Sequence, residues 1–314
     1  MAVKLNKVKM LGILLTSTED FNNQYKEGKT LLHWACIKSS PSILHKLMGR
    51  THGHIKNIHG DIPLTVAIKY NNERAVDMLW HSVHLDPTVR DNHENTTLHM
   101  ACRHDNLPLL ELIIAHTRDI NARNMFNETP LHHACSFKNQ NAIKRLKNKY
   151  ADRNALDMRG QTPLIIATIM NCTKAAKELF NAENTPLHPI LLNDDINSKD
   201  VIIVNGETIN IRTCVLLDAT DEYANTALHY CSFFGNKELA SFLINKGART
   251  TVLNNEADSP VALLAKLPSG YNCPIYTEVY EPLLEMQWQV PEIEMQQFFP
   301  EEEPIGLGDD LLLI

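Results

Sequence analysis

A short pattern returns along most of the 314-residue chain at a nearly constant interval, and this periodicity limits the possible folds more than any other feature. Most copies contain a threonine, then a leucine, often a histidine, and a small residue. The intervals between threonine-equivalent positions are 32, 34, 33, 33, 64 and 33 residues. Because one interval is close to two periods, the pattern is continuous and predicts a solenoid of stacked units. The threonine-equivalent positions are 30, 62, 96, 129, 162, 226 and 259.

The copies resemble the ankyrin repeat, whose unit of about 33 residues carries Thr-Pro-Leu-His-x-Ala at the start of its first helix. "NETPLHHAC" from Asn127 and "ENTTLHMAC" from Glu94 match this motif, and "ADRNALD" (Ala151 to Asp157) matches the link between units. The resemblance covers roughly residues 26–266. It implies an all-α solenoid of helix-turn-helix units joined by finger loops. Three prolines fall where the first helical residue is expected, a position that tolerates a missing N–H: Pro63, Pro130 and Pro163.

Two regions depart from the repeat. Between residues 181 and 220 the pattern slips, and "VIIVNGETINIR" (201–212) predicts an enlarged β-hairpin because Asn-Gly is a strong turn signal. This region holds either a degenerate repeat with an enlarged finger or a loop inserted between two repeats. Residues 1–25 are expected to form an N-terminal capping helix, and 267–314 an acidic, proline-containing tail. The expected units are 26–56, 57–90, 91–123, 124–156, 157–180, the degenerate or inserted segment 181–220, then 221–253 and a partial unit 254–266.

Charge and cysteine usage narrow the class of partner. The formal net charge is −7 and no basic cluster is present, which argues against binding to nucleic acid. No apolar run approaches the ~18 residues of a membrane span, so no membrane association is expected. The seven cysteines are scattered and never form Cys-x-x-Cys, which favours free thiols in a reducing compartment. We therefore expect a cytoplasmic monomer whose partner is another protein.

The recurring histidines and cysteines do not indicate catalysis. In the resembled family this histidine is structural and bonds to the backbone of adjacent repeats. His52, His54 and His59 lie on one expected finger, but no Cys or carboxylate accompanies them in a zinc-site spacing, so a polar loop is expected. We predict no catalytic residue, no cofactor and no metal. The rival interpretation is an enzyme that uses Cys172 or Cys214 with a nearby histidine beside the insert. The recurring residues are His33, His99, His132 and His229, with Cys36, Cys102, Cys135 and Cys231 at small-residue positions.

Positions that the repeat leaves free are the candidate partner-binding residues. Aromatic residues and Met are enriched in the centres of protein interfaces. If the residue between His and Ala faces the groove under the fingers, then Trp34, Met100, His133 and Tyr230 form an exposed column. The alternative is that such side chains pack against the next repeat. One turn further the candidates are Tyr70, His104, Phe137 and Phe234, and at the finger tips they are His93, Phe126 and Tyr223.

The last 48 residues differ in charge from the rest. Residues 267–314 contain ten Asp and Glu and no Lys, Arg or His, so the other 266 residues carry +3. The tail also keeps apolar side chains such as Trp288 and Phe298, which predicts docking in cis or a separate linear motif. Its end, "FFPEEEPIGLGDDLLLI", resembles the terminus of bacterial ankyrin effectors delivered by type IV secretion into host cytoplasm. The alternatives are an inhibitor-of-kappa-B-like cytosolic regulator and an ordinary cytosolic adaptor.

Overall fold

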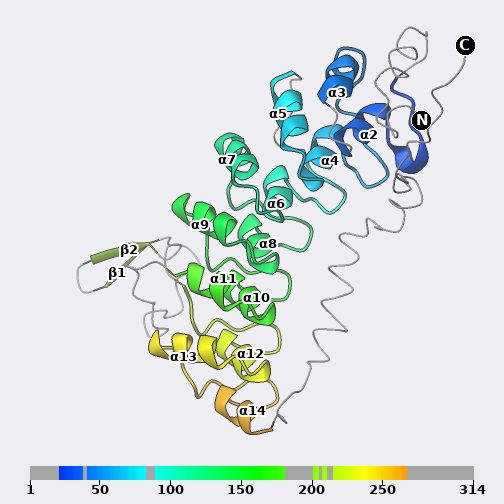
Figure 1. Cartoon of the computed structure of the whole chain (residues 1–314). Coiled ribbons are helices and arrows are strands. Elements are labelled where there is room, and N and C mark those ends of the chain that lie inside the picture. Colours follow the sequence, from blue (N-terminus) through cyan, green and yellow to red (C-terminus); the bar gives the residue numbers. More distant parts are fainter. Residues whose placement is uncertain are drawn as a thin grey trace, which may run out of the picture.

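The computed structural model describes residues 21–37, 41–82, 89–180, 201–204, 207–210 and 215–266. The fold is the expected all-α solenoid, in which helix pairs stack into one curved array (Figure 1). The first described residues, 21–25, are not helical, and a short 3-10 turn, η1 (Lys26–Gly28), precedes the first helix pair. Residues 1–20 of the expected capping helix lie outside the described residues, as does the acidic tail.

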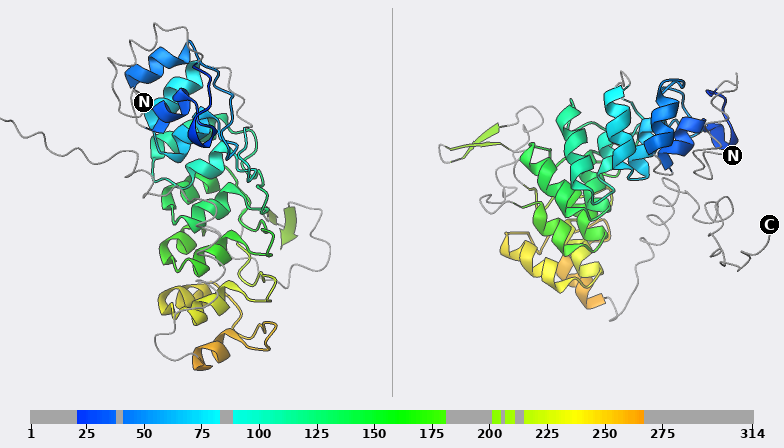
Figure 2. Two further views of the ribbon diagram at one scale, coloured as in Figure 1. Left: turned by 90° about the vertical axis from the view of Figure 1, so that its right-hand side faces the viewer. Right: turned by 45° about the horizontal axis from the view of Figure 1, so that its top comes forward.

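Each unit contributes an inner and an outer helix, except the last, of which the described residues include only the inner helix α14. Figure 1 shows the inner helices together on the concave side of the array and the outer helices on the convex side. The connecting loops project in a row along one edge (Figure 2). The inner helices are α2 (Leu31–Ile37), α4 (Pro63–Lys69), α6 (Thr97–Ala101), α8 (Pro130–Ser136), α10 (Pro163–Ile169), α12 (Ala227–Phe233) and α14 (Pro260–Lys266). The outer helices are α3 (Pro41–Met48), α5 (Glu73–Ser82), α7 (Leu107–His116), α9 (Gln140–Asn148), α11 (Thr173–Glu178) and α13 (Lys237–Asn245).

The repeated motif explains how each inner helix begins. Thr96 is the N-cap of α6, and His99 closes a capping box in which its ring Nδ1 lies 2.8 Å from the Thr96 hydroxyl. The same arrangement starts α8 and α12. Pro63, Pro130 and Pro163 stand in the first turn of their helices, as expected. Because a threonine oxygen satisfies N–H groups that a helix start leaves free, the motif fixes where each unit begins.

Unit five, which contains α10 and α11, and unit six, which contains α12 and α13, are direct neighbours in the stack. The inner helix α10 contacts α12, and the outer helix α11 contacts α13. Asn236 Nδ2 donates to Asn171 Oδ1 at 2.8 Å, and the backbone N–H of Leu216 donates to Asn154 Oδ1 at 2.9 Å. Asp152 N–H makes the corresponding bond to Asn121 Oδ1 at 2.8 Å in the preceding units. The stack therefore has no place for a degenerate repeat between units five and six, and the interpretation of an inserted segment is the one that fits.

The insertion can be located to one connection. Residues 181–214 stand between Phe180 and Val215, where unit four has only residues 148–150 between Lys147 and Ala151. This excess accounts for the long interval seen in the sequence. Within it, β1 (Val201–Val204) and β2 (Glu207–Asn210) pair antiparallel, with Val204 opposite Glu207. The turn between the strands and the end of the predicted hairpin, 211–212, lie outside the described residues.

The core runs the length of the array and is built from leucine, isoleucine, alanine and cysteine. Leu98, Leu131 and Leu164 at one repeat position are each 1% exposed, as Leu32 and Leu64 are. Burial on this scale between neighbouring units supplies most of a solenoid's stability. Among the described residues, every helix is too short or too polar to cross a lipid bilayer.

Candidate protein-interaction surface

The recurring histidines hold neighbouring units together. Each uses Nδ1 on its own threonine and Nε2 on a backbone carbonyl of the next unit. His99 Nε2 lies 3.0 Å from the oxygen of Glu128, and His132 Nε2 lies 3.1 Å from that of Gln161. His33 and His229 make the same bond to Asp61 and Asp258. Burial lowers the pKa of His99 to about 3 and that of His132 to about 4. These neutral, fully bonded rings are structural, as the resemblance implied.

The cysteines of the repeats are buried free thiols. Cys36, Cys102, Cys135 and Cys231 are at most 1% exposed, and burial raises the pKa of each thiol. A thiol held protonated is a poor nucleophile. Cys172 is half-buried at the N-cap of α11, whereas Cys214 lies outside the described residues. The described residues contain no group of three or more potential metal ligands, and His52 and His54 stack on each other with ring centroids 5.4 Å apart.

Six finger loops share one turn geometry, which we define by residues 57–61, 91–95, 124–128, 157–161, 221–225 and 254–258. The first residue is always Asn or Asp, and its side-chain oxygen accepts from the backbone N–H groups two and four positions later. In the fourth finger, Asp157 Oδ1 accepts from Arg159 and Gln161, both at 2.8 Å. Asn57, Asp91, Asn124, Asp221 and Asn254 do the same. Such Asx turns fix the shape of each tip.

Neighbouring fingers are joined by a ladder of backbone hydrogen bonds. The N–H of Met125 donates to the oxygen of His93 at 3.0 Å, and that of Met158 donates to Phe126 at 2.9 Å. The ladder passes the insertion without a break, since Glu222 donates to Arg159 at 2.9 Å. Tips that are bonded in this way form one ordered edge rather than six independent loops.

Large apolar side chains are exposed on this edge. We call four of them the fingertip row: Ile58 is 61% exposed, Met125 50%, Met158 68% and Tyr223 48%. They belong to four different fingers but occupy the second or third position of the same turn. Exposed apolar groups that lie singly need no explanation, but a row along one edge of a repeat array indicates a binding surface.

Arginines border the row. Arg123 donates from one guanidinium nitrogen to the oxygens of Asn127 and Leu156, at 3.0 and 2.7 Å, and so spans two fingers. Arg90 does the same with Glu94 and Arg123, at 2.8 and 2.6 Å. A guanidinium carries five N–H donors, so these bonds position the group and leave further donors. The edge therefore combines apolar and cationic chemistry.

The predicted exposed column is wrong. Met100 is 0% exposed, His133 2%, Tyr230 6% and Trp34 7%. His133 Nε2 lies 3.0 Å from Glu128 Oε2, and the Tyr230 hydroxyl donates to Asp221 Oδ2 at 2.5 Å. These side chains meet the neighbouring unit and the base of a finger. The alternative stated for them, packing between repeats, is what the structure shows.

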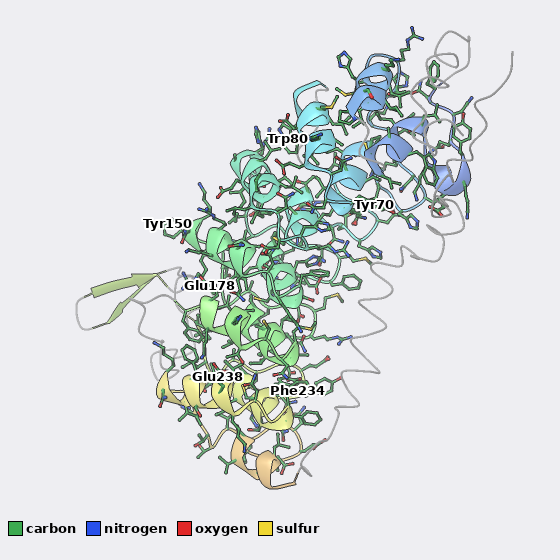
Figure 3. The ribbon with its side chains drawn as sticks, in the orientation of Figure 1. Tyr70, Trp80, Tyr150, Glu178, Phe234 and Glu238 are labelled. Atoms are coloured by element: carbon green, nitrogen blue, oxygen red, sulfur yellow. The ribbon has the colours of Figure 1, made fainter. Side chains whose placement is uncertain are left out.

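The candidates one turn further are half-buried. Figure 3 shows Tyr70 and Phe234 on the inner-helix side, and both pack against the core. Burial raises the pKa of Tyr70 to about 12. The guanidinium of Arg103 lies 4.9 Å from the ring centroid of Phe137. Burial lowers the pKa of His104, so this ring is also drawn into the unit interface.

The tip candidates are the ones that reach the surface. Tyr223 is exposed, while His93 and Phe126 are half-buried and stack with centroids 6.0 Å apart. His93 Nδ1 also lies 3.3 Å from the sulfur of Met125. The residues predicted at the tips are third in their turns, whereas the structure also exposes Ile58, Met125 and Met158 at the second position. The Asn or Asp that opens each turn was the available signal, because it sets the register of the tip.

Comparison with known proteins agrees with this architecture. Family models described as "Ankyrin repeats (3 copies)" match residues 1–91, 41–124 and 98–200, and one described as "Ankyrin repeat" matches 224–255. The chain is 26% identical over 202 residues to protein L371 of Acanthamoeba polyphaga mimivirus, which its name describes as an ankyrin repeat protein. The alignment covers 64% of this chain and 22% of that protein, so this chain spans about a fifth of its relative's length.

A solved structure shares the fold. The crystal structure of the ankyrin repeat domain of Bcl-3, a unique member of the IkappaB protein family, superposes with a TM-score of 0.56 at 24% identity. The match covers 76% of this chain and 95% of that one. Ankyrin repeats are protein-protein interaction scaffolds and are generally noncatalytic. Because the family models match more than half of its residues, the chain belongs to the ankyrin-repeat family.

Proposed function

We propose that this protein is a noncatalytic scaffold that binds a partner protein along the finger edge of its concave face. The observation that carries the proposal is the fingertip row, in which Ile58, Met125, Met158 and Tyr223 are all about half exposed or more. Met adapts its shape to irregular partner surfaces, and Tyr is enriched among the residues that anchor protein interfaces. The inner-helix column, Trp34, Met100, His133 and Tyr230, contributes stability instead, since these side chains are already buried.

The contact would be formed by a rigid edge. Asx turns and the backbone ladder hold the tips in place before binding, so little conformational entropy is lost on association. Arg90 and Arg123 supply hydrogen-bond donors beside the apolar groups. An interface of this composition, with an apolar centre and a charged border, has the anatomy of a specific protein complex.

Affinity capture with a fingertip variant tests the proposal. The variant carries Ile58→Ser, Met125→Ser, Met158→Ser and Tyr223→Ser, and proteins retained from cell lysate are compared with those retained by wild type. A matched control replaces two exposed residues of the opposite side, Tyr150 (71% exposed) and Ile244 (46%), by Ser. Figure 3 shows Tyr150 on the outer-helix side. We expect the fingertip variant alone to lose specific partners while its helical circular dichroism is unchanged. If both variants retain the same proteins as wild type, the finger edge is not the binding surface.

The biological setting is a finer proposal. The sequence supports a cytosolic regulator, an adaptor, or an effector delivered into a host cell, and the fold shared with the Bcl-3 domain is compatible with the first. A translocation reporter fused upstream of residues 267–314 separates the effector from the others. Delivery into host cells that is lost when Glu301, Glu302 and Glu303 become Gln supports the effector setting, and absence of delivery refutes it.

A further inference from the structure

We propose that the acidic C-terminal segment, residues 267–314, occupies the first four fingers in cis and so competes with the partner for the fingertip row. The inference rests on the proposed function in one respect, because the partner protein and residues 267–314 would bind the same row. It adds a competing ligand that is part of the chain itself.

The first four fingers combine apolar tips with cations. Ile58, Met125 and Met158 supply the apolar groups. Exposed Lys56 precedes the first tip, and exposed Arg123 precedes the third. Neither cation has a carboxylate partner in the part of the chain that the structure describes. The matching ligand is an extended segment that carries both carboxylates and apolar side chains.

The last two fingers have the opposite character. Glu222 and Glu256 are exposed in these turns, and no Lys or Arg stands within residues 220–225 or 253–258. In the first four fingers, by contrast, Lys56 and Arg123 directly precede a turn, Arg159 lies in one, and the exposed Glu94 is paired with Arg90 at 3.7 Å. Like charges repel an acidic segment there. The charge distribution therefore directs such a segment away from the end of the array at which it starts and toward the first four fingers.

The C-terminal segment has the required chemistry. It carries ten carboxylates and no basic group, together with Tyr276, Tyr280, Trp288, Phe298 and Phe299. A segment that was only acidic would stay solvated, and one that was only apolar would have no preference for the cationic fingers. This composition fits both properties of the row.

The segment is also long enough. Helix α14 ends at Lys266, and the 48 residues that follow can extend to about 160 Å at about 3.3 Å per residue. Six steps between units at about 10 Å each amount to about 60 Å. A tether of this kind gives an effective concentration on the order of millimolar, so individually weak contacts are sufficient.

Methionine oxidation provides a residue-resolved test. The 314-residue chain is treated with hydrogen peroxide, and mass spectrometry follows sulfoxide formation at Met125, Met158 and the buried control Met100. The same is done for a chain ending at Lys266 and for a 314-residue variant with Glu301, Glu302 and Glu303→Gln and Asp309 and Asp310→Asn. We expect Met125 and Met158 to react at least about threefold faster in both altered proteins, with Met100 unchanged, because the segment shields exposed sulfurs.

Three outcomes overturn the proposal. Unchanged rates at Met125 and Met158 would show that the segment does not cover the tips. A parallel rise at Met100 would indicate loosening of the fold instead of release of a docked segment. Protection that grows with protein concentration would place the segment on a second copy. None of these outcomes depends on a partner, so failure here leaves the capture experiment on the fingertip row standing.

Discussion

The fingertip row and the inner-helix column both consist of residues that the repeat leaves free, yet their environments are opposite. Met100 in the column is 0% exposed, whereas Met158 at a tip is 68% exposed. The column is covered by the next unit, and the tips extend beyond it. A position that varies between repeats is therefore not by that alone a candidate binding residue. The residue must also lie where stacking leaves it uncovered, and in this array that place is the Asx turn.

The largest expected effect is a difference in the free energy of unfolding between a variant of the column and a variant of the row. Met100→Ala should lower the free energy of unfolding by about 2–5 kcal/mol, because it removes buried side-chain contacts and leaves a cavity. Met158→Ala should change it by less than about 0.5 kcal/mol, as exposed substitutions usually do. Urea denaturation of both variants measures the difference. Similar losses would mean that the tips are part of the core.

A second prediction concerns the buried histidines beneath the tips. Burial lowers the pKa of His99 from 6.5 to about 3, so the unfolded chain binds a proton between these values that the folded chain does not. Well above pH 6.5 the titration of His99 does not change the free energy of unfolding. As the pH is lowered below this value, the free energy of unfolding falls. Between pH 7 and pH 5 the loss is about 2 kcal/mol.

Comparison with His99→Gln isolates this group. Wild type should lose about 2 kcal/mol more than the variant between pH 7 and pH 5 in urea titrations. Burial raises the pKa of Asp157 to about 6, which acts in the opposite sense, but that contribution is common to both proteins and cancels. Equal pH dependence in the two proteins would show that His99 is not held neutral in the fold.

The third prediction concerns residues 181–214. It tests whether the units on either side stay stacked, and so keep the row and the column continuous, when this segment is shortened. Replacing residues 181–214 by the three residues that unit four uses, Asn-Lys-Tyr, should leave the solenoid intact. Stability should be unchanged or rise by up to about 2 kcal/mol, because a shorter loop costs less entropy to close. A single cooperative transition in thermal unfolding is expected. Two transitions, or loss of helical signal, would show that the segment joins the units instead of branching from them.

The sequence predicts the scaffold well for a physical reason. The threonine cap, the proline that follows it and the bridging histidine act within one unit or between adjacent units, so a single chain displays them many times. His132 illustrates this, since its two bonds recur at His33, His99 and His229. The fold therefore follows from the repeat, and the structural role of these rings from the resemblance to the ankyrin repeat.

The proposed binding surface is harder to predict because exposure depends on packing between units. A residue between His and Ala looks the same in sequence whether it is covered or open; Tyr230 is only 6% exposed, and its hydroxyl donates to Asp221. The Asx turn decides which residue of each finger is exposed, and it places Met125 and Met158 one position before the residues that the sequence predicts at the tips. The insertion was found, but its place outside the stack follows from bonds such as Leu216 to Asn154 that span 62 residues.

The most direct test of the central claim, that the tips are open for recognition while the column is core, is the ratio of two oxidation rates within one molecule. In the chain ending at Lys266, peroxide oxidation of Met158 is compared with that of Met100 by mass spectrometry. The account predicts that Met158 reacts at least about tenfold faster, because one sulfur is exposed and the other is enclosed by neighbouring units. Equal rates would contradict the division of the concave face into a buried column and an exposed fingertip row.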